Sequence, residues 1–296
     1  MSRQQQTAQV RDGHGFIAAL DQSGGSTPKA LAAYGISKDA YANDTEMFNL
    51  IHGMRSRIVN APAFTGGKIV GAILFEMTMD REINGKPSAH YLWEDRKVVP
   101  FLKIDKGLMD DADGVQLMKP MDHLDTLLPR AVEAGIFGTK MRSVINEASQ
   151  MGIAANVAQQ FEVGNQVLDH GLVPILEPEI NIKMANKGDA EEMLRDEILN
   201  QLDRIGDNRI MLKLTLPEKP NTYLPLVNNP KVMRVVALSG GYDRQEANRR
   251  LAQNKGVIAS FSRALTEGLS ADQDDDTFNA TINTTIDDVY AASVAG

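Results

Sequence analysis

Eight short apolar runs of strand length recur along the chain and alternate with segments of helical character. The helical segments carry apolar residues three or four positions apart, as in the stripe Met47, Ile51, Met54 and Ile58. Strands that alternate with helices are typical of a parallel sheet, because parallel strands need a long crossover between them. The runs cover residues 15–21, 69–75, 98–105, 136–142, 173–179, 209–214, 233–239 and 257–263.

This alternation predicts an α/β fold, and we expect residues 1–296 to form a single (β/α)8 barrel, or TIM-barrel, domain. The long interval 22–68 predicts an extra helix after the first strand, and the apolar stripe from Phe278 to Tyr290 predicts a C-terminal closing helix. Asp189 and Asp243, each three residues before a Glu, are typical of helix starts. An open doubly wound sheet would show the same alternation, but the placement of the polar residues favours the barrel.

Composition excludes several classes of protein. The 31 basic and 39 acidic residues give a net charge of −8 without a dense Lys/Arg run, which argues against a nucleic-acid partner. No apolar stretch approaches the ~18 residues of a membrane span, and the N-terminus lacks a secretory signal, so we expect a cytoplasmic protein without a membrane partner. The chain has no Cys, and its five His lack metal-ligand spacing, so we expect no metal site.

Charged and hydroxyl side chains gather at the carboxyl ends of the apolar runs. Several are two positions apart, which places them on one face of a strand. In a barrel the carboxyl ends converge on one mouth, where active sites are built. The residues at these ends are Asp21, Lys103, Asp105, Lys140, Arg142, Glu177, Glu179, Lys213, Ser239, Ser260 and Arg263.

These charges have two interpretations. A single charge at a strand end is commonly half of an ion pair, so the three basic residues Lys103, Lys140 and Arg142 could simply neutralise their acidic neighbours. Burying an ion costs several kcal/mol, however, and stability alone does not explain that cost on several strands. The pattern as a whole therefore favours a functional site.

Lys213 is the sharpest catalytic candidate. It lies among apolar neighbours in the segment 211–216, which would desolvate the ammonium group and favour the neutral amine. A neutral lysine amine can form a Schiff base with a carbonyl substrate. Glu177 and Glu179, on either side of Pro178, are suited to proton transfer near such an amine.

Two glycine-containing segments predict phosphate binding. Ser239-Gly240-Gly241 follows the seventh run, and Arg263 closes the eighth. Barrels commonly bind phosphate at this place with backbone N–H groups, and an arginine can add two parallel hydrogen bonds. The segment 21–26 is a second loop of this kind, with Lys29 one turn further on.

Seven of these segments, in the same order, resemble motifs of the class I, Schiff-base-forming fructose-1,6-bisphosphate aldolases, most closely the shorter bacterial members. The resemblance extends from GFIAALDQSGGSTPKAL at 15–31 to ASFSRAL at 259–265. Between these ends lie LKIDKG at 102–107, GTKMR at 138–142, VPILEPEI at 173–180, MLKLT at 211–215 and LSGG at 238–241.

The resemblance implies a lyase that reversibly cleaves fructose 1,6-bisphosphate into dihydroxyacetone phosphate and glyceraldehyde 3-phosphate without a metal or organic cofactor. Lys213 would form the Schiff base and Glu177 would be the main acid and base, with Lys140, Glu179 and Asp21 assisting. The implied ligands of the ketone-side phosphate are Ser239, Gly240, Gly241, Ser260 and Arg263, and those of the aldehyde-end phosphate are Lys103, Arg142, Ser26 and Lys29.

Two positions depart from the larger family members. They have Glu where this chain has Gln22, and Arg where it has Ala30. The expected partners are small sugar phosphates, and since the animal members form tetramers, a homo-oligomer is also compatible with the resemblance. The alternatives are a Schiff-base aldolase of another sugar phosphate, such as a single-phosphate ketose, and a non-catalytic sugar-phosphate-binding barrel.

Overall fold

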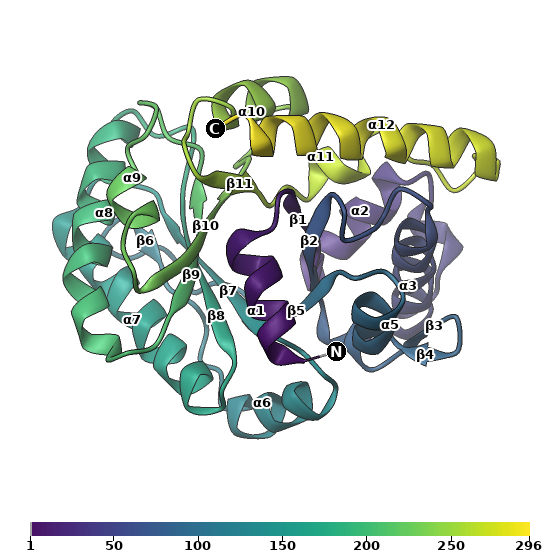
Figure 1. Ribbon diagram of the computed structural model, residues 1–296, viewed down its shortest axis with the longest axis horizontal. Helices are drawn as coiled ribbons and strands as arrows, with labels where there is room; N and C mark the ends of the chain where they lie inside the picture. Colours follow the sequence, from purple (N-terminus) through teal and green to yellow (C-terminus); the bar gives the residue numbers. More distant parts are fainter. Residues whose placement is uncertain (1) are drawn as a thin grey trace.

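Within residues 2–296, which the computed structural model describes apart from the side chain of Ala264, eight parallel strands curve into a nearly closed barrel (Figure 1). All eight expected strands are present. Their order in the sheet follows their order in the chain, which confirms the barrel and excludes the doubly wound alternative. The strands are β1 (Phe16–Leu20), β2 (Ile69–Leu74), β5 (Val99–Lys103), β7 (Gly138–Ile145), β8 (Val173–Ile180), β9 (Ile210–Thr215), β10 (Val232–Leu238) and β11 (Val257–Ala259).

A seam remains between the first and the last strand. β1 and β11 are in contact, but in the described part of the chain no ladder of backbone hydrogen bonds joins them. β11 has only three residues and pairs with β10 on its other side. The barrel is therefore held by continuous ladders from β1 round to β11 and by other contacts across the seam.

The strands are apolar throughout because they are buried on both faces. Side chains that alternate along a strand point inward and outward in turn. In β1, Ile17 belongs to a cluster inside the barrel, whereas Ala18 and Leu20 pack in the cluster between strands and helices. The inner cluster consists of Val10, Ile17, Val70, Ile73, Trp93, Val99, Phe101, Phe137, Ile175, Met211, Val236 and Ile258.

Helices surround the barrel and confirm the expected outer layer. The interval after β1 contains α2 (Thr27–Ala33) and α3 (Asp44–Asn60), and the closing helix is α12 (Asp275–Val294), which packs on β11 and β1. No helix in residues 2–296 combines the length and the hydropathy needed to cross a membrane. The other long helices are α5 (Ser88–Glu94), α6 (Leu124–Glu133), α7 (Gln150–Asp169), α8 (Lys187–Leu202) and α10 (Arg244–Leu251).

The loops contain short helices, 3-10 turns and short strands. The helical ones are α4 (Glu76–Met79), α9 (Leu224–Val227), α11 (Arg263–Thr266) and the 3-10 turns η1 (Gly24–Ser26), η2 (Lys38–Ala40) and η3 (Asp203–Ile205). β3 (Glu82–Ile83) and β4 (Lys86–Pro87) form a small hairpin, and β6 (Val115–Gln116) pairs with the end of β7.

Two details of the sequence prediction are corrected. Arg263 does not end a strand, because β11 stops at Ala259 and Arg263 is the first residue of α11. Asp189 does not cap α8, which begins two residues earlier after Asn186. Asp243 is the N-cap of α10, as expected, and accepts a hydrogen bond from the backbone N of Glu246.

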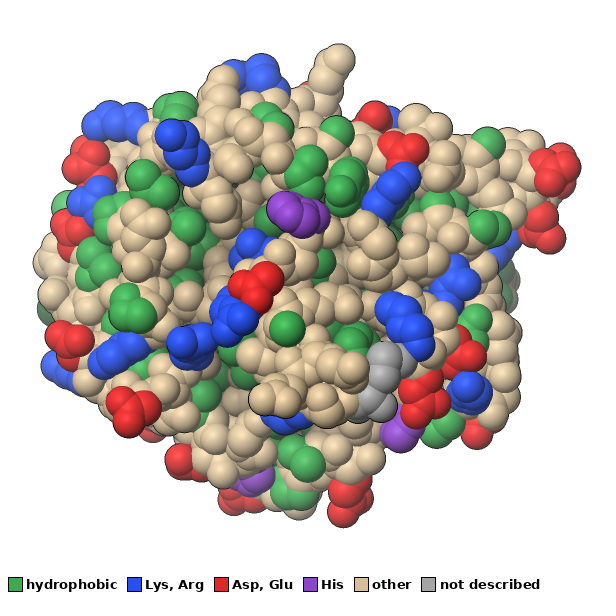
Figure 2. All heavy atoms as spheres, viewed as in Figure 1, with side chains coloured by type: hydrophobic (Ala, Val, Ile, Leu, Met, Phe, Trp, Pro, Cys, Tyr) green, Lys and Arg blue, Asp and Glu red, His purple; other side chains and the backbone are tan. Residues whose placement is uncertain are grey.

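An N-terminal helix that the sequence did not suggest, α1 (Arg3–Asp12), covers the amino-terminal end of the barrel (Figure 1). Its Val10 side chain is buried in the inner cluster, and Arg3 donates a hydrogen bond of 2.9 Å to the carbonyl oxygen of Phe137. Figure 2 shows this face, where acidic and basic side chains are interspersed. The α1 helix closes one end of the barrel, so the carboxyl end is the one available for a site.

Candidate active site

The carboxyl ends of the strands surround a cavity of 660 Å³ at the mouth of the barrel. Strand geometry places charges there: Met211 belongs to the inner cluster, and Lys213, two residues later, shares its face and reaches the mouth. Gly241 lies just outside the lining, next to Gly240. The expected residues that line the cavity are Asp21, Ser26, Lys29, Lys103, Asp105, Lys140, Arg142, Glu177, Glu179, Lys213, Ser239, Gly240, Ser260 and Arg263.

Glu177 lies between two lysines at the centre of the mouth. Its Oε1 is 3.0 Å from Nζ of Lys213, and its Oε2 is 2.9 Å from Nζ of Lys140. Lys140 also contacts Oδ2 of Asp21 at 2.6 Å. All four side chains are at most 10% exposed. They form an alternating row, Lys213–Glu177–Lys140–Asp21, which we call the central ion-pair chain.

The alternation of charge determines which side chains of the central ion-pair chain are ionised. Burial opposes ionisation of Asp21 and Glu177, but the charges of Lys140 and Lys213 hold the pKa of both carboxyl groups below the ordinary range. Burial also opposes the charge on Lys140, yet Asp21 and Glu177 raise its pKa above the ordinary value. Glu177 is therefore a carboxylate in the resting site, within reach of a proton on Lys213.

Two further ion pairs border the central chain. Nζ of Lys103 lies 2.6 Å from Oδ1 of Asp105, and Nε of Arg142 lies 2.6 Å from Oε2 of Glu179. Burial, reinforced by the charge of Lys140, lowers the pKa of Lys103 despite its carboxylate partner. The neutralising pairs considered for the sequence thus exist, but they line an open cavity rather than a packed core, which leaves them accessible to a ligand.

The turn after β10 is shaped to bind an anion. Gly240 and Gly241 adopt φ angles of 61° and 127°, and the backbone N of Tyr242 closes the turn on the carbonyl oxygen of Ser239. A Cβ atom on Gly241 would lie 3.5 Å from Nη2 of Arg263, so the guanidinium is next to the turn. Backbone N–H groups in such a turn, together with a guanidinium, form a concave anion site.

Ser260 adds a hydroxyl group to this side of the cavity. Its side chain is 1% exposed, and its Oγ has no hydrogen-bond partner among residues 2–296. A buried hydroxyl group without a partner costs free energy unless a ligand or water satisfies it. Ser260 is therefore suited to binding a polar group in the cavity.

The residues before and within α2 form another part of the lining. Ser26 and Lys29 are both exposed, and the Ser26 hydroxyl donates to the carbonyl oxygen of Ser23 at 2.9 Å. Ala30 also lines the cavity, so Lys29 is the cation that α2 contributes. The lining also includes Gln22, which the sequence marked only as a departure from the larger family members, and Ser262, which the sequence analysis did not single out. The only sequence signal for Ser262 was its adjacency to Arg263.

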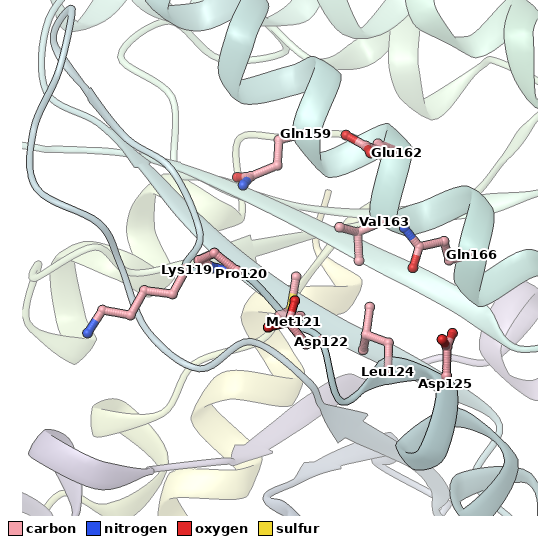
Figure 3. A pocket seen from close by; sticks show the side chains of 10 residues that line it. All are labelled: Lys119, Pro120, Met121, Asp122, Leu124, Asp125, Gln159, Glu162, Val163 and Gln166. Carbon is pink, nitrogen blue, oxygen red and sulfur yellow. The ribbon is translucent and has the colours of Figure 1, made fainter.

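A second cavity, of 320 Å³, lies between the segment that leads into α6 and the helix α7 (Figure 3). Its charged lining consists of Asp122, Asp125 and Glu162, with Lys119 pointing away from them in Figure 3. Three carboxylates repel an anionic substrate, so the mouth of the barrel is the better candidate for a sugar phosphate. In the described part of the chain no three His, Asp or Glu side chains are arranged to hold a metal ion.

A family model described as class-I fructose-bisphosphate aldolase matches residues 3–231 of the chain. The class 1 fructose-bisphosphate aldolase of Porphyromonas gingivalis is 56% identical over 290 residues, which cover 98% of this chain and 99% of that protein. The proteins of the same name from Synechocystis sp. and Clostridium acetobutylicum are 53% and 56% identical, over 98% and 95% of this chain and 97% and 95% of their own lengths.

A solved structure has the same fold. The chain superposes with a TM-score of 0.81 on the fructose-bisphosphate aldolase of Plasmodium falciparum, solved in complex with TRAP and a small-molecule inhibitor. The alignment covers 99% of this chain and 94% of that chain at 19% sequence identity. At this level of identity the similarity supports the barrel fold, whereas the matches to the bacterial relatives identify the family.

Proposed function

The chain belongs to the class-I fructose-bisphosphate aldolase family, and on that premise we propose that Lys213 forms a Schiff base with the substrate. The function of the protein is the reversible cleavage of fructose 1,6-bisphosphate into dihydroxyacetone phosphate and glyceraldehyde 3-phosphate. The observation that carries the assignment of Lys213 is its buried amine, 3.0 Å from the Glu177 carboxylate in a cavity with cations for the phosphates.

The first half of the reaction forms the electron sink. Glu177 accepts a proton from Lys213, and the neutral amine attacks the C2 carbonyl carbon of the ketose. The carbinolamine that results loses its hydroxyl group as water, with Glu177 returning the proton to the departing oxygen. The nitrogen of Lys213 is then a cationic iminium, and the protein itself supplies the electrophile without a metal or organic cofactor.

The second half breaks the C3–C4 bond. A carboxylate removes the proton of the C4 hydroxyl group, the bonding electrons move to C3 and the iminium nitrogen, and glyceraldehyde 3-phosphate leaves. The enamine is protonated at C3, and water hydrolyses the iminium to release dihydroxyacetone phosphate and free Lys213. Lys140 and Glu179 assist these proton transfers, and Asp21 orients Lys140 through its contact of 2.6 Å.

Phosphate contacts hold the ketose in register with Lys213. Arg263, Ser260 and the turn Ser239-Gly240-Gly241 bind the C1 phosphate beside the ketone. At the aldehyde end, the C6 phosphate is bound by Lys103, Arg142, Ser26 and Lys29. Remote binding of this kind positions the carbonyl carbon for attack and contributes to kcat as well as to KM.

We also propose that residues 1–296 form a single catalytic domain, which acts in the cytoplasm on small sugar phosphates. The inner cluster supports the single domain, because it contains side chains from α1 near one end of the sequence and from β11 near the other.

Borohydride trapping tests the chemistry directly. Reduction in the presence of dihydroxyacetone phosphate is expected to attach the three-carbon unit to Lys213, as read by peptide mass mapping. Attachment to another lysine, or to none, would remove the proposed mechanism. A Lys213→Met variant, which cannot form an imine at this position, is the matched control.

Two activity measurements separate the alternatives. Treatment with EDTA is expected to leave turnover unchanged, whereas activity lost to EDTA and restored by zinc would indicate a metal-dependent aldolase. Turnover of fructose 1-phosphate against fructose 1,6-bisphosphate shows whether the enzyme prefers the single-phosphate or the bisphosphate ketose.

A further inference from the structure

Arg55 is a fully buried cation that the proposed mechanism does not use. It lies on α3, its exposed fraction is 0%, and burial lowers its pKa to about 10 despite the charge of Asp21. Its guanidinium donates to neutral oxygen atoms: Nη1 to Oγ1 of Thr78 at 2.8 Å, and Nη2 to the backbone oxygen of Gln22 at 2.5 Å. Burying a charged guanidinium without a carboxylate partner costs free energy. The hydrogen bonds of Arg55 to a loop residue at the mouth therefore indicate a role other than stability.

The same guanidinium sets the orientation of the Gln22 amide. Nη2 of Arg55 also donates to Oε1 of Gln22 at 3.3 Å. An arginine can only donate, so it holds the amide oxygen on its own side and turns the amide nitrogen the other way. Nε2 of Gln22 then donates to Oγ of Ser262 at 2.9 Å.

This last hydrogen bond crosses the seam of the barrel. Gln22 follows β1, and Ser262 follows β11, the two strands that no backbone ladder joins within residues 2–296. On the other side, the backbone N of Ser260 donates to the carbonyl oxygen of Ala237 at 2.8 Å, which ties the segment to β10. The segment 260–263 is thus held from both sides, by backbone toward β10 and by the Gln22 side chain toward β1.

Ser262 is next to the phosphate ligand assigned above. It immediately precedes Arg263, the first residue of α11, whose guanidinium lies beside the turn at Gly241. A shift of the backbone at Ser262 moves the start of α11 and with it the guanidinium of Arg263. The separation between Arg263 and the turn therefore depends on the row Arg55–Gln22–Ser262.

We infer that Arg55 and Gln22 are positioning residues that hold Ser262 across the seam, so that Arg263 grips the C1 phosphate of the ketose. The inference rests on the proposed function, in which Arg263 binds that phosphate. The role of Gln22 requires an amide, because its oxygen accepts from Arg55 and its nitrogen donates to Ser262. A carboxylate at this position would keep the contact to Arg55 but could no longer donate.

The test compares ketoses with and without a C1 phosphate. Gln22→Met keeps the length of the side chain and removes the amide contacts to Arg55 and Ser262, together with a longer one of 3.5 Å to the carbonyl oxygen of Ala19. It is expected to raise KM for fructose 1,6-bisphosphate and lower kcat/KM by about 5- to 10-fold, the effect of one lost hydrogen bond. The kcat/KM for fructose 6-phosphate, which lacks the C1 phosphate, is expected to change less than about two-fold.

A double-mutant cycle shows whether Gln22 and Ser262 act through their shared hydrogen bond or independently of each other. Ser262→Ala is expected to reproduce the effect of Gln22→Met, and the double variant is expected to be no worse than the more impaired single variant. Gln22→Glu, which keeps an acceptor for Arg55, is expected to fall between wild type and Gln22→Met. Arg55→Lys, which keeps the charge but loses the planar fork, is expected to act in the same direction as Gln22→Met.

The control is a glutamine that bridges elements elsewhere. The amide of Gln159 accepts from the backbone N of Met118 at 2.8 Å and donates to its carbonyl oxygen at 2.9 Å, away from the mouth. Gln159→Met is expected to leave the ratio of kcat/KM between the two ketoses unchanged. If Gln22→Met also leaves that ratio unchanged, whether by no effect or by equal losses, the positioning role is wrong.

Phosphate binding distinguishes this failure from failure of the proposed function. Wild-type enzyme that neither cleaves fructose 1,6-bisphosphate nor traps dihydroxyacetone phosphate would refute the proposed function. Binding of inorganic phosphate, measured by calorimetry, tests the positioning without turnover. We expect Gln22→Met to bind inorganic phosphate about 5- to 10-fold more weakly than wild type, and equal affinity would overturn the inference.

Discussion

At the scale of single residues, Lys140 determines the charge state of the mouth. It contacts both Asp21 and Glu177, and it lowers the pKa of each carboxyl group more than Lys213 does. Groups with a depressed pKa stabilise the fold above their unfolded pKa of about 4, and this contribution is lost as the pH falls toward the folded value. Lys140, whose pKa is raised, stabilises the fold below its unfolded pKa of about 10.4, and its contribution is lost as the pH rises past that value.

Replacing Lys140 by Met is therefore expected to destabilise the protein in a pH-dependent way. The change removes the cation that contacts both buried carboxylates, which should cost about 3–5 kcal/mol near pH 7. The difference from wild type should narrow as the pH falls below about 4, because protonation removes the uncompensated charges. Urea unfolding at several pH values measures the difference in the free energy of unfolding between the variant and the wild type. Lys86→Met, which removes an exposed pair with Asp95, is the control, and a difference independent of pH would contradict the explanation.

Arg263 tests geometry separately from charge. Arg263→Lys keeps the positive charge but loses the planar fork that can bind a phosphate through two hydrogen bonds. The loss should be about 2–3 kcal/mol, or roughly 30- to 150-fold in kcat/KM for fructose 1,6-bisphosphate, with part of it in kcat. A ketose without the C1 phosphate should be much less affected. Equal losses on both ketoses would show that Arg263 is a structural residue at the rim.

At the scale of elements, the strands could be predicted because burial on both faces makes them continuous apolar runs. The run at 257–263 continues past its ladder through Phe261, so the sequence could not show that β11 ends at Ala259. α1 escaped prediction because it is polar and buries only Gln6 and Val10. Its position is fixed by what it covers, which local sequence does not encode.

In the candidate site, too, some features could be predicted from the sequence and others could not. Spacing of two along β7 and β8 correctly placed Lys140 with Arg142, and Glu177 with Glu179, in one mouth. The neutralising pairs Lys103–Asp105 and Arg142–Glu179 could also be anticipated from the sequence, but the contacts that join different parts of the mouth could not. Asp21 reaches Lys140 from the loop that follows β1, and the hydrogen bond of Gln22 to Ser262 depends on how the barrel closes. These pairings follow from tertiary geometry, which the order of residues does not reveal.

α8 offers an element-scale prediction through its contact with the loop after β9. Nζ of Lys187 lies 2.5 Å from Oε1 of Glu191 and 2.7 Å from the carbonyl oxygen of Leu216, all buried. Lys187→Met would leave Glu191 buried without its cation, and we expect the free energy of unfolding to fall by about 3–5 kcal/mol in urea titrations.

The same two elements provide the control. Lys219, on the loop, contacts Glu192, on α8, at 3.1 Å, and its side chain is 77% exposed. An exposed pair contributes little, so Lys219→Met should lower the free energy of unfolding by less than about 1 kcal/mol. Similar losses in the two variants would mean that burial does not distinguish the pairs.

At the scale of the whole molecule, the two ends of the barrel have different tasks. α1 fills the amino-terminal end with Val10 and joins the inner cluster, while the carboxyl end stays open as the 660 Å³ cavity. α12 packs on both β11 and β1 and so covers the outside of the seam. The seam is thus covered by a helix on its outer side and bridged by Gln22 at the mouth.

The charged lining of the mouth has a consequence for how substrate arrives. The whole chain carries a net charge of −8, yet the cavity is lined by six cations, Lys29, Lys103, Lys140, Arg142, Lys213 and Arg263, against four carboxylates. A bisphosphate diffusing in dilute buffer is repelled by the molecule as a whole. At physiological ionic strength that repulsion is screened beyond about 8 Å, and the excess of two positive charges at the mouth governs the final approach. The association rate should therefore respond to added salt more weakly than that of an enzyme with a net positive charge. Stopped-flow measurements between about 10 and about 150 mM salt, where the screening length falls from about 30 to about 8 Å, test this expectation.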